Sequence, residues 1–375
     1  MHAHPYHEVV SGAQLKQSPN GGGFESKAPK AKLESVQILR AIAALLVVVH
    51  HQVSLEARYG RGEPLLTGFI GGFGVDIFFV ISGFVMFYVA ANKPAGLESA
   101  KRFILARVTR IAPLYWFYTL LFAGVLFLLQ RFLRTPDPVD LVRVTDSLLF
   151  WPQNGALPLI HQGWTLSYEM LFYFLFSLSL FFKKWRVPIL IVAMLCLVSS
   201  GAFLHAQQHK ALLVATSPLL IEFILGMFIA RLFVSGFIIS YSLALPVCLI
   251  GFGVLFAISP VCHYETDLLQ RLWMWGLPSA AIVLGATQME RSREMNLPWL
   301  AAVGDASYSL YLSHMLVLPV VDRLWNKYGV DSGIVFLGFV LAACILVAFI
   351  SYRWIETPFL RWATTRLSRR STAAA

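Results

Sequence analysis

The most regular feature of the sequence is a run of about twenty apolar residues that recurs between short polar segments. Twenty residues of α-helix are about 30 Å long, which matches the hydrocarbon core of a bilayer. The pattern therefore predicts an all-α fold, a polytopic transmembrane helical bundle with ten spans. These are expected at residues 36–55, 68–91, 111–130, 164–182, 187–206, 213–233, 237–258, 268–288, 300–321 and 333–354.

The positive charges predict the orientation of this bundle. In a ten-span count most Lys and Arg residues fall on one side, whereas the opposite loops hold fewer, interleaved with Asp and Glu. Segments rich in Lys and Arg next to membrane helices remain in the cytoplasm. Both termini are therefore predicted to be cytoplasmic. The longest loop on the opposite side, residues 131–162, is placed to cover the mouth of a site.

Three segments are expected along the chain. Residues 1–34 are polar and rich in Gly, Pro, Ser and Lys, which predicts a disordered cytoplasmic tail. This segment lacks the apolar stretch of a signal peptide, so the first membrane helix is expected to act as its own anchor. Residues 35–362 form the membrane domain, and residues 363–375 form a basic cytoplasmic tail.

The composition agrees with an integral membrane protein. Hydrophobic residues make up 57% of the chain, charged residues make up 13%, and the mean hydropathy is +0.67. The formal charge of +10 would suggest nucleic acid in a soluble protein, but these cations lie between apolar runs, so no nucleic acid is expected. The four cysteines are scattered and indicate neither a disulfide framework nor a metal site. We expect a multi-pass protein of the inner (plasma) membrane.

The first predicted helix carries the candidate chemistry, because Arg40 and His51 lie inside its apolar run. A charged residue at the centre of a bilayer costs about 2.5 kcal/mol or more, so each needs a compensating partner. The two residues are eleven positions apart, which is about three helical turns. Both side chains therefore leave nearly the same helix face, roughly 16 Å apart along the axis.

Three further ionisable residues are predicted at the depth of His51. Counting 1.5 Å per residue places Asp76, Glu169 and His314 in the outer half of the membrane, on three other helices. Because lipid would expel each of them, they must face one another or a wet cavity. A carboxylate beside His51 would orient the imidazole and stabilise its charged form.

Arg107 and Arg110 lie at the depth of Arg40, where the third span is expected to begin. The amides of a helix N-terminus would add partial positive charge there. A site with cations inside and an imidazole outside fits a long anionic donor such as acetyl-CoA, with its phosphates on the arginines. His51 would then act as general base on an acceptor hydroxyl.

The same residues admit a structural interpretation that the sequence leaves open. Arg107 and Arg110 also satisfy the bias of positive residues toward the cytoplasm. Asp76 and Glu169 would equally well join helices, as buried polar residues do in membranes. His314 would equally well belong to a packed, hydrogen-bonded cluster.

Several motifs in this order resemble the integral-membrane acyltransferase 3 family, over about residues 36–362. They are Arg40 and His51 at their spacing, GVDIFFVISGF around Asp76, RVTRIAPLYW from Arg107, WTLSYEMLFY around Glu169, SYSLYLSH ending at His314, and WIETPFL. The chain is most similar to exopolysaccharide and O-antigen acetyltransferases. The resemblance implies catalysis by His51, with Arg40, Arg107 and Arg110 required for it.

The resemblance also implies an O-acyltransferase that moves an acetyl group from cytoplasmic acetyl-CoA to a hydroxyl of an exported or surface glycan. The acceptor would be a glycan or a lipid-linked saccharide. Two alternatives remain open at this point: a transporter or flippase of a lipid-linked glycan that performs no chemistry in the same cavity, and an acyltransferase with a small-molecule acceptor. Either a direct transfer or an acetyl-imidazole on His51 would be compatible with these residues.

Overall fold

The structure is a computed structural model that describes residues 32–59, 70–90, 93–133, 140–154, 157–204, 209–259, 267–292, 295–328 and 333–372. Within these ranges all regular structure is helical, as the sequence predicts. Most of the N-terminal tail, residues 1–31, lies outside the described residues. The segment expected as a C-terminal tail, residues 363–375, is helical as far as Thr372.

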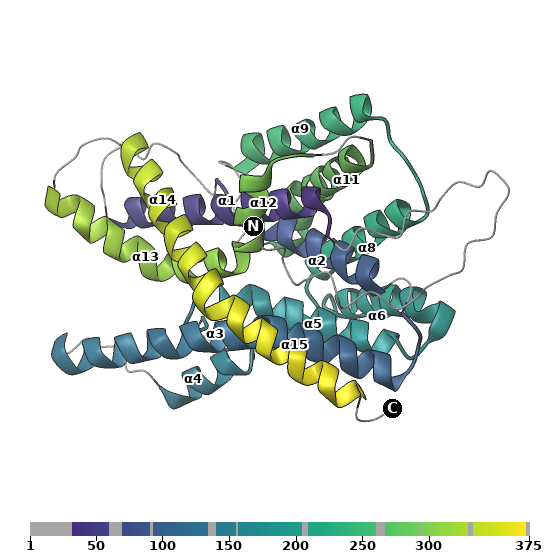
Figure 1. Cartoon of the computed structure of the whole chain (residues 1–375), viewed down its shortest axis with the longest axis horizontal. Helices are drawn as coiled ribbons and strands as arrows, with labels where there is room; N and C mark the ends of the chain where they lie inside the picture. The colour runs from purple at the N-terminus through teal and green to yellow at the C-terminus, as the bar shows by residue number, and fades with distance from the viewer. Residues whose placement is uncertain are drawn as a thin grey trace.

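Each predicted membrane segment coincides with helix (Figure 1). These helices are α1 (Glu34–Tyr59), α2 (Gly74–Ala90), α3 (Leu97–Leu133), α5 (Gly163–Ser179), α6 (Arg186–Ser200), α7 (Lys210–Ala215), α8 (Leu220–Val234), α9 (Tyr241–Ile258), α10 (Leu268–Arg271), α11 (Leu277–Ser292), α12 (Pro298–Asp305), α13 (Ser307–Tyr328) and α14 (Gly333–Ser351). Another helix, α15 (Thr357–Thr372), follows the last predicted segment. A further helix, α4 (Leu141–Leu148), lies in the loop between α3 and α5.

Five helical segments among the described residues are long and apolar enough to cross a membrane. They are 34–55, 97–130, 210–234, 241–258 and 333–366, and α2 is a shorter apolar helix. Many large apolar side chains on these helices are exposed, including Phe127, Ile250 and Leu346. Outward-facing apolar side chains are expected where the surrounding solvent is lipid rather than water.

Close packing around α2 brings the functional elements together. A Cβ on Gly226 of α8 would lie 2.0 Å from the Val80 oxygen of α2, and one on Gly83 of α2 would lie 2.1 Å from the Phe223 oxygen of α8. On its other side α2 packs against α1, where Gly74 approaches the Ala43 oxygen. Small residues allow membrane helices to approach this closely. Asp76 on α2 is thereby fixed between α1 and α8.

Several of the helices are interrupted where the sequence predicts continuous spans. Pro218 lies between α7 and α8, and Ala306 lies between α12 and α13. In the described part of the chain there are two π-helical turns, η5 (Leu272–Gly276) between α10 and α11, and η6 (Tyr352–Glu356) between α14 and α15. Such turns are often found at functional sites. Here η5 follows Arg271, and η6 ends on Glu356.

The third span differs from its prediction. α3 begins at Leu97, so Arg107 and Arg110 lie about ten residues inside the helix rather than at its start. The expected positive charge from N-terminal amides does not apply to them, because that effect is confined to the first turn. The apolar pattern did not reveal the earlier start because exposed charged residues, such as Glu98 and Lys101, interrupt the first turns of α3.

Candidate active site

His51 on α1 has one ring nitrogen engaged with the backbone. Its Nδ1 lies 2.9 Å from the carbonyl oxygen of Val47, one turn earlier. A carbonyl can only accept, so Nδ1 carries the proton in the neutral ring. The other nitrogen, Nε2, then holds a free lone pair. This is the tautomer that a general base requires.

His314 on α13 packs beside His51. The two ring centroids are 5.1 Å apart, and His314 Nε2 lies 3.3 Å from His51 Nδ1. His314 Nδ1 lies 3.1 Å from the Leu310 carbonyl and must donate to it, which leaves Nε2 as an acceptor. The sequence therefore correctly predicted that these two histidines meet. His314 Nε2 can accept a hydrogen bond from His51 Nδ1.

The loop before α5 contributes two residues to this pair that the sequence reading did not identify. The amide nitrogen of Gln162 lies 3.0 Å from His314 Nε2 and donates to it. The His161 ring lies 5.9 Å from the His51 ring, centroid to centroid. The signal was present as a polar His-Gln pair just before the apolar run of α5. The last residues of loop 131–162, which was expected to cover the mouth of a site, thus lie beside the histidine pair.

Asp76 does not join the histidines. Its two oxygens accept hydrogen bonds from Arg271 Nε and Nη2, each 2.9 Å long, and both side chains are buried. The Arg271 guanidinium also lies over Trp164 and Trp275, 5.5 and 5.1 Å from their ring centroids. Asp76 therefore joins helices, which is the structural alternative that the sequence left open. Arg271 was missed, although it stands in an apolar run.

Glu169 on α5 lies on the cationic side of the site. Its Oε1 accepts hydrogen bonds from Tyr173 and from Ser82, the latter 3.2 Å long. Glu169 lines a narrow cavity of about 140 Å³ together with all three predicted arginines, Arg40, Arg107 and Arg110. Both carboxylates that were expected beside His51 are thus engaged elsewhere, because depth in the membrane does not decide which helix faces which.

The narrow cavity extends from these arginines toward the histidines. Tyr308, Tyr311 and Thr165 line it as well, and the Tyr311 and Thr165 hydroxyls are 2.8 Å apart. The Tyr311 ring lies 6.2 Å from the His314 ring, centroid to centroid. The cavity therefore has three cations in its lining, and Tyr311 connects it to His314 of the histidine pair.

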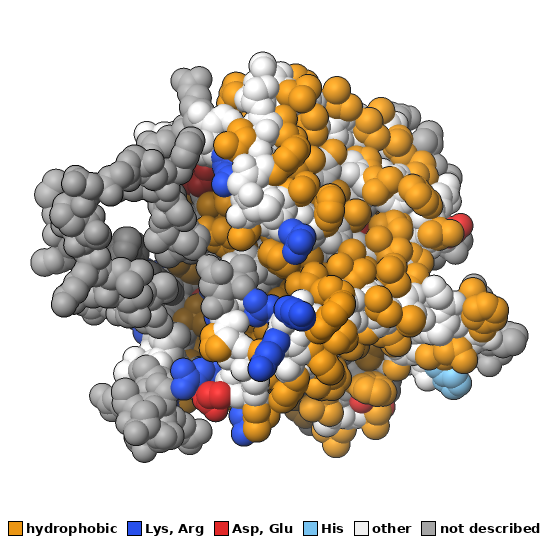
Figure 2. Space-filling model, turned by 90° about the vertical axis from the view of Figure 1, so that its right-hand side faces the viewer, with side chains coloured by type: hydrophobic (Ala, Val, Ile, Leu, Met, Phe, Trp, Pro, Cys, Tyr) orange, Lys and Arg blue, Asp and Glu red, His pale blue; other side chains and the backbone are white. Residues whose placement is uncertain are grey.

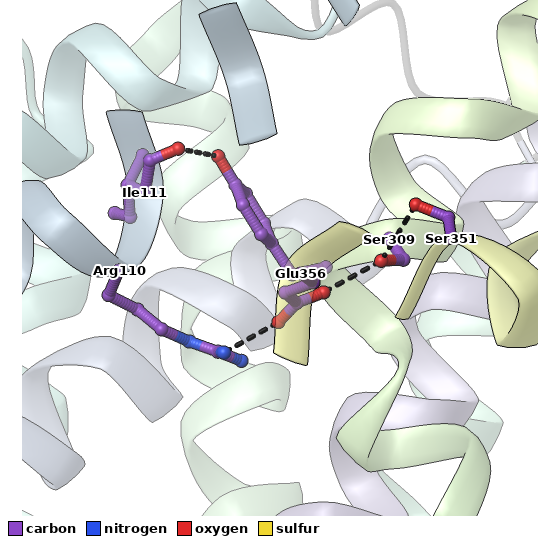
Figure 3. Close-up of polar contacts among 6 residues, drawn as sticks. Arg110, Ile111, Ser309, Ser351 and Glu356 are labelled. Atoms are coloured by element: carbon purple, nitrogen blue, oxygen red, sulfur yellow. Dashed lines mark hydrogen bonds and ion pairs between the residues drawn. The ribbon is translucent and has the colours of Figure 1, made fainter. Parts of the chain in front are cut away.

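Arg110 and Arg107 are held differently. Arg110 forms an ion pair with the buried Glu356 of η6, at 2.5 Å (Figure 3). Ser309 donates to the other oxygen of Glu356 at 2.7 Å, and Tyr308 donates to the Ile111 carbonyl at 2.8 Å. By contrast, Nε of Arg107 is buried and has no hydrogen-bond partner among the described residues. A buried guanidinium donor without an acceptor is costly and would be satisfied by an anionic ligand.

Metal ligands were not expected at this site. Among the described residues, no group of three or more His, Cys, Asp or Glu side chains is arranged to hold a metal ion. The histidine cluster brings His51 together with His161 and His314, but two nitrogens of this cluster already donate to backbone carbonyls. Each of these rings keeps a lone pair on Nε2, which can accept a proton.

Comparison with known proteins agrees with this geometry. Residues 33–353 match the family model described as an acyltransferase domain. The exopolysaccharide production protein ExoZ of Rhizobium meliloti (strain 1021) is 34% identical over 310 residues, which cover 79% of this chain and 92% of ExoZ. No solved structure matches this chain.

Two staphylococcal relatives are more distant. The O-acetyltransferase OatA of Staphylococcus aureus (strain NCTC 8325 / PS 47) is 25% identical over 85% of this chain and 56% of OatA. The putative O-acetyltransferase SAR0937 of S. aureus (strain MRSA252) is 24% identical over 93% of this chain and 61% of that protein. The match to the family model spans most of the chain, including the arginines, the histidines and the narrow cavity between them. The chain therefore belongs to the acyltransferase 3 family and is a membrane acyltransferase.

Proposed function

We propose that the protein is a multi-pass O-acetyltransferase of the inner (plasma) membrane, with ten spans and both termini in the cytoplasm. The packing of the described helices supports an alternation of direction. Gly74 of α2 meets Ala43 of α1, whereas the earlier Gly71 meets Leu46, so the two helices are antiparallel. Lys93, Lys101, Lys183 and Lys184 then fall on the side where α2 and α5 end, which the positive-inside rule assigns to the cytoplasm.

Acetyl-CoA is the proposed donor, and the narrow cavity is the observation that carries this proposal. Arg40, Arg107 and Arg110 line it, and Tyr311, which also lines it, packs against His314 of the histidine pair. A thin pantetheine arm would pass along the cavity while phosphates remain on the arginine side. Arginine suits this role because its planar fork binds phosphate oxygens with charge-assisted hydrogen bonds.

His51 is the proposed general base. The proton of the acceptor hydroxyl moves to His51 Nε2 as the acceptor oxygen attacks the thioester carbonyl. The new C–O bond forms, the C–S bond breaks, and CoA leaves as a thiolate that takes the proton from the imidazolium. Val47 and His314 face His51 Nδ1 with acceptors, so they would stabilise the imidazolium as the third member of a triad does.

The proposed acceptor is a glycan hydroxyl, in keeping with relatives named for exopolysaccharide production and O-acetyl transfer. A second cavity, of about 440 Å³, opens between α3, α13 and the loop before α5. His161 lines it, and the His161 ring is near the His51 ring. Its walls are largely apolar, with Gln130 and Arg143 as polar members, which suits a lipid-linked saccharide.

The test is transfer of labelled acetyl groups from acetyl-CoA in membranes that contain the His51→Ala variant. Loss of a general base should lower kcat at least 100-fold, while expression remains normal. The matched control is His209→Ala, an exposed histidine at the start of α7. Wild-type turnover in the His51→Ala variant would refute the proposed base. Glycan movement that needs no CoA in the wild-type protein would instead favour the transporter.

A further inference from the structure

A large pocket lies between the ends of α2, α5, α6 and α8 and is separate from the narrow cavity. It has a volume of about 1100 Å³. Five cations line it, and its lining includes no Asp or Glu. These cations are Lys93, Lys183, Lys184, Arg186 and Arg231. Figure 2, which looks onto the right-hand side of Figure 1, shows Lys and Arg side chains gathered among hydrophobic ones on this face.

The sizes of the two cavities are matched to different parts of a ligand. Sites for drug-sized ligands usually enclose about 300–1,000 Å³. The narrow cavity, at about 140 Å³, is too small for a nucleotide and has room only for a thin chain. A donor whose thioester reaches His51 must therefore leave its bulky phosphorylated end outside this cavity. The cationic pocket, at about 1100 Å³, is large enough for it.

The two cavities are neighbours at the ends of α2 and α5. Met86 and Tyr173 line the narrow cavity, whereas Phe87 and Phe176 line the cationic pocket. Lys93 in the pocket is close to Arg107 in the narrow cavity: burial lowers the pKa of the Lys93 amine, and the Arg107 cation lowers it further. Arg186 donates to the Lys93 carbonyl at 3.0 Å, which fixes the segment after α2 to α6. A row of cations thus connects the two spaces.

Building on the proposed function, we propose that the cationic pocket binds the phosphorylated nucleoside end of the acyl-CoA donor. The lysines and arginines would neutralise the phosphates, and the pantetheine arm would pass Arg107 into the narrow cavity. The apolar walls, which include Val187 and Ile191, would cover the nucleoside. An anionic phospholipid would satisfy the same charges, but it would not explain why the row of cations continues to Arg107.

The experiment compares two donors, acetyl-CoA and S-acetylpantetheine, which share the arm and thioester but differ in the nucleotide. In the Lys183→Gln/Lys184→Gln variant, KM for acetyl-CoA should rise about tenfold because two charge-assisted contacts are lost. KM for S-acetylpantetheine should stay at the wild-type value. Lys183 and Lys184 are exposed, so the variant should fold normally. Lys101→Gln, an exposed cation of α3 that lines neither cavity, is the matched control.

Binding provides a readout that does not depend on turnover. Adenosine 3′,5′-bisphosphate should bind the purified wild-type protein in zwitterionic nanodiscs. It should bind the double variant about tenfold less tightly. An unchanged KM for acetyl-CoA, or an equal rise for both donors, would overturn the assignment. So would a double variant whose only defect is weaker binding of anionic phospholipid. Wild-type protein that accepts acetyl from neither donor would refute the proposed function itself, and the pocket assignment with it.

Discussion

In the proposed mechanism, His314 assists His51 in its role as general base. Nδ1 of each ring donates to a carbonyl one turn earlier in its own helix, Val47 for His51 and Leu310 for His314. Both rings are therefore set in the same tautomer by local helix geometry. Tertiary packing adds the contact of 3.3 Å between His314 Nε2 and His51 Nδ1. That contact places an acceptor where charge develops on His51 when it takes a proton.

The His314→Ala variant should therefore lose turnover without losing donor affinity. Removing the acceptor that faces His51 Nδ1 should lower kcat about 10- to 100-fold, because the imidazolium loses one of its two acceptors. KM for acetyl-CoA should stay within about twofold, since the donor's charges are expected at the arginine side. Steady-state kinetics in membranes measure both. A variant with raised KM and normal kcat would contradict the role given to His314.

The buried pair of Asp76 and Arg271 is a structural element of the same bundle. Arg271 is 3% exposed and Asp76 is fully buried. Glu222 is also fully buried and lies next to Asp76. Arg271 is thus the cation that faces two buried carboxylates. The pair joins α2 to the segment before η5.

The Arg271→Gln variant should be destabilised by about 3–5 kcal/mol, because it leaves buried carboxylates without their cation. Thermal unfolding in detergent measures this. The exposed pair of Arg102 and Glu98 is the matched comparison, and Arg102→Gln should cost less than about 1 kcal/mol. Adding Asp76→Asn to Arg271→Gln should recover part of the loss. Equal stability of the Arg271→Gln and Arg102→Gln variants would show that the buried pair contributes no more than an exposed one.

At the scale of elements, α2 and α8 pack so closely that backbone meets backbone. A Cβ on Gly226 would lie 2.0 Å from the Val80 oxygen and 2.7 Å from the Phe84 nitrogen, both on α2. Backbone atoms inside a helix cannot move aside as the end of a flexible side chain can. The approach therefore depends on the absence of a side chain at this position.

The Gly226→Ala variant should be destabilised by about 3 kcal/mol, because the added methyl group forces α2 and α8 apart. Gly253 of α9 is a matched control, since a Cβ there would meet nothing within 4 Å. Gly253→Ala should instead stabilise its helix by about 0.5–1 kcal/mol. Thermal unfolding of the two purified variants compares them directly. Destabilisation of both to the same extent would mean that packing at Gly226 is not the cause.

The elements also show what the sequence could and could not predict. The apolar runs located the helices, because the length needed to cross a bilayer is a local property of the chain. The 1.5 Å rise per residue gave the depth of each polar residue, and it correctly brought His51 and His314 together. Depth does not give the direction in which a side chain points or the helix it faces. Asp76 and Glu169 were therefore assigned to the histidines, whereas they contact Arg271 and Tyr173.

The missed partners share one physical origin. Arg110 pairs with Glu356, and Asp76 pairs with Arg271, which is 195 residues away in the chain. No local pattern records which helices are neighbours in a bundle, since apolar faces of membrane helices are interchangeable in lipid. A charged residue in an apolar run indicates that an oppositely charged or polar partner is needed, but the sequence around it does not identify that partner. Gln162 was missed for a simpler reason, because neutral polar residues in loops are common.

At the scale of the whole molecule, the proposed activity depends on the orientation of the bundle. Donor and acceptor sites must open on opposite sides, so that the arginines face cytoplasmic acetyl-CoA while the loop before α5 faces outward. The alternating directions of the helices and the positive charges between them support ten spans with both termini inside. An odd number of spans would place one terminus outside and would break this arrangement.

Labelling with a membrane-impermeant maleimide in intact cells tests this orientation. In a background with all four cysteines replaced, a single cysteine at Asn154, an exposed residue in the loop before α5, should react from outside. A single cysteine at Lys101 or at Thr365 of α15 should react only after the membrane is permeabilised, because both are expected in the cytoplasm. If the cysteines at positions 101 and 365 react from opposite sides of the membrane, the two ends of the chain cannot both lie in the cytoplasm with the donor. The acyl group could then not follow the proposed route, which leads from the arginines on the cytoplasmic side to His51 near the outer side of the bundle.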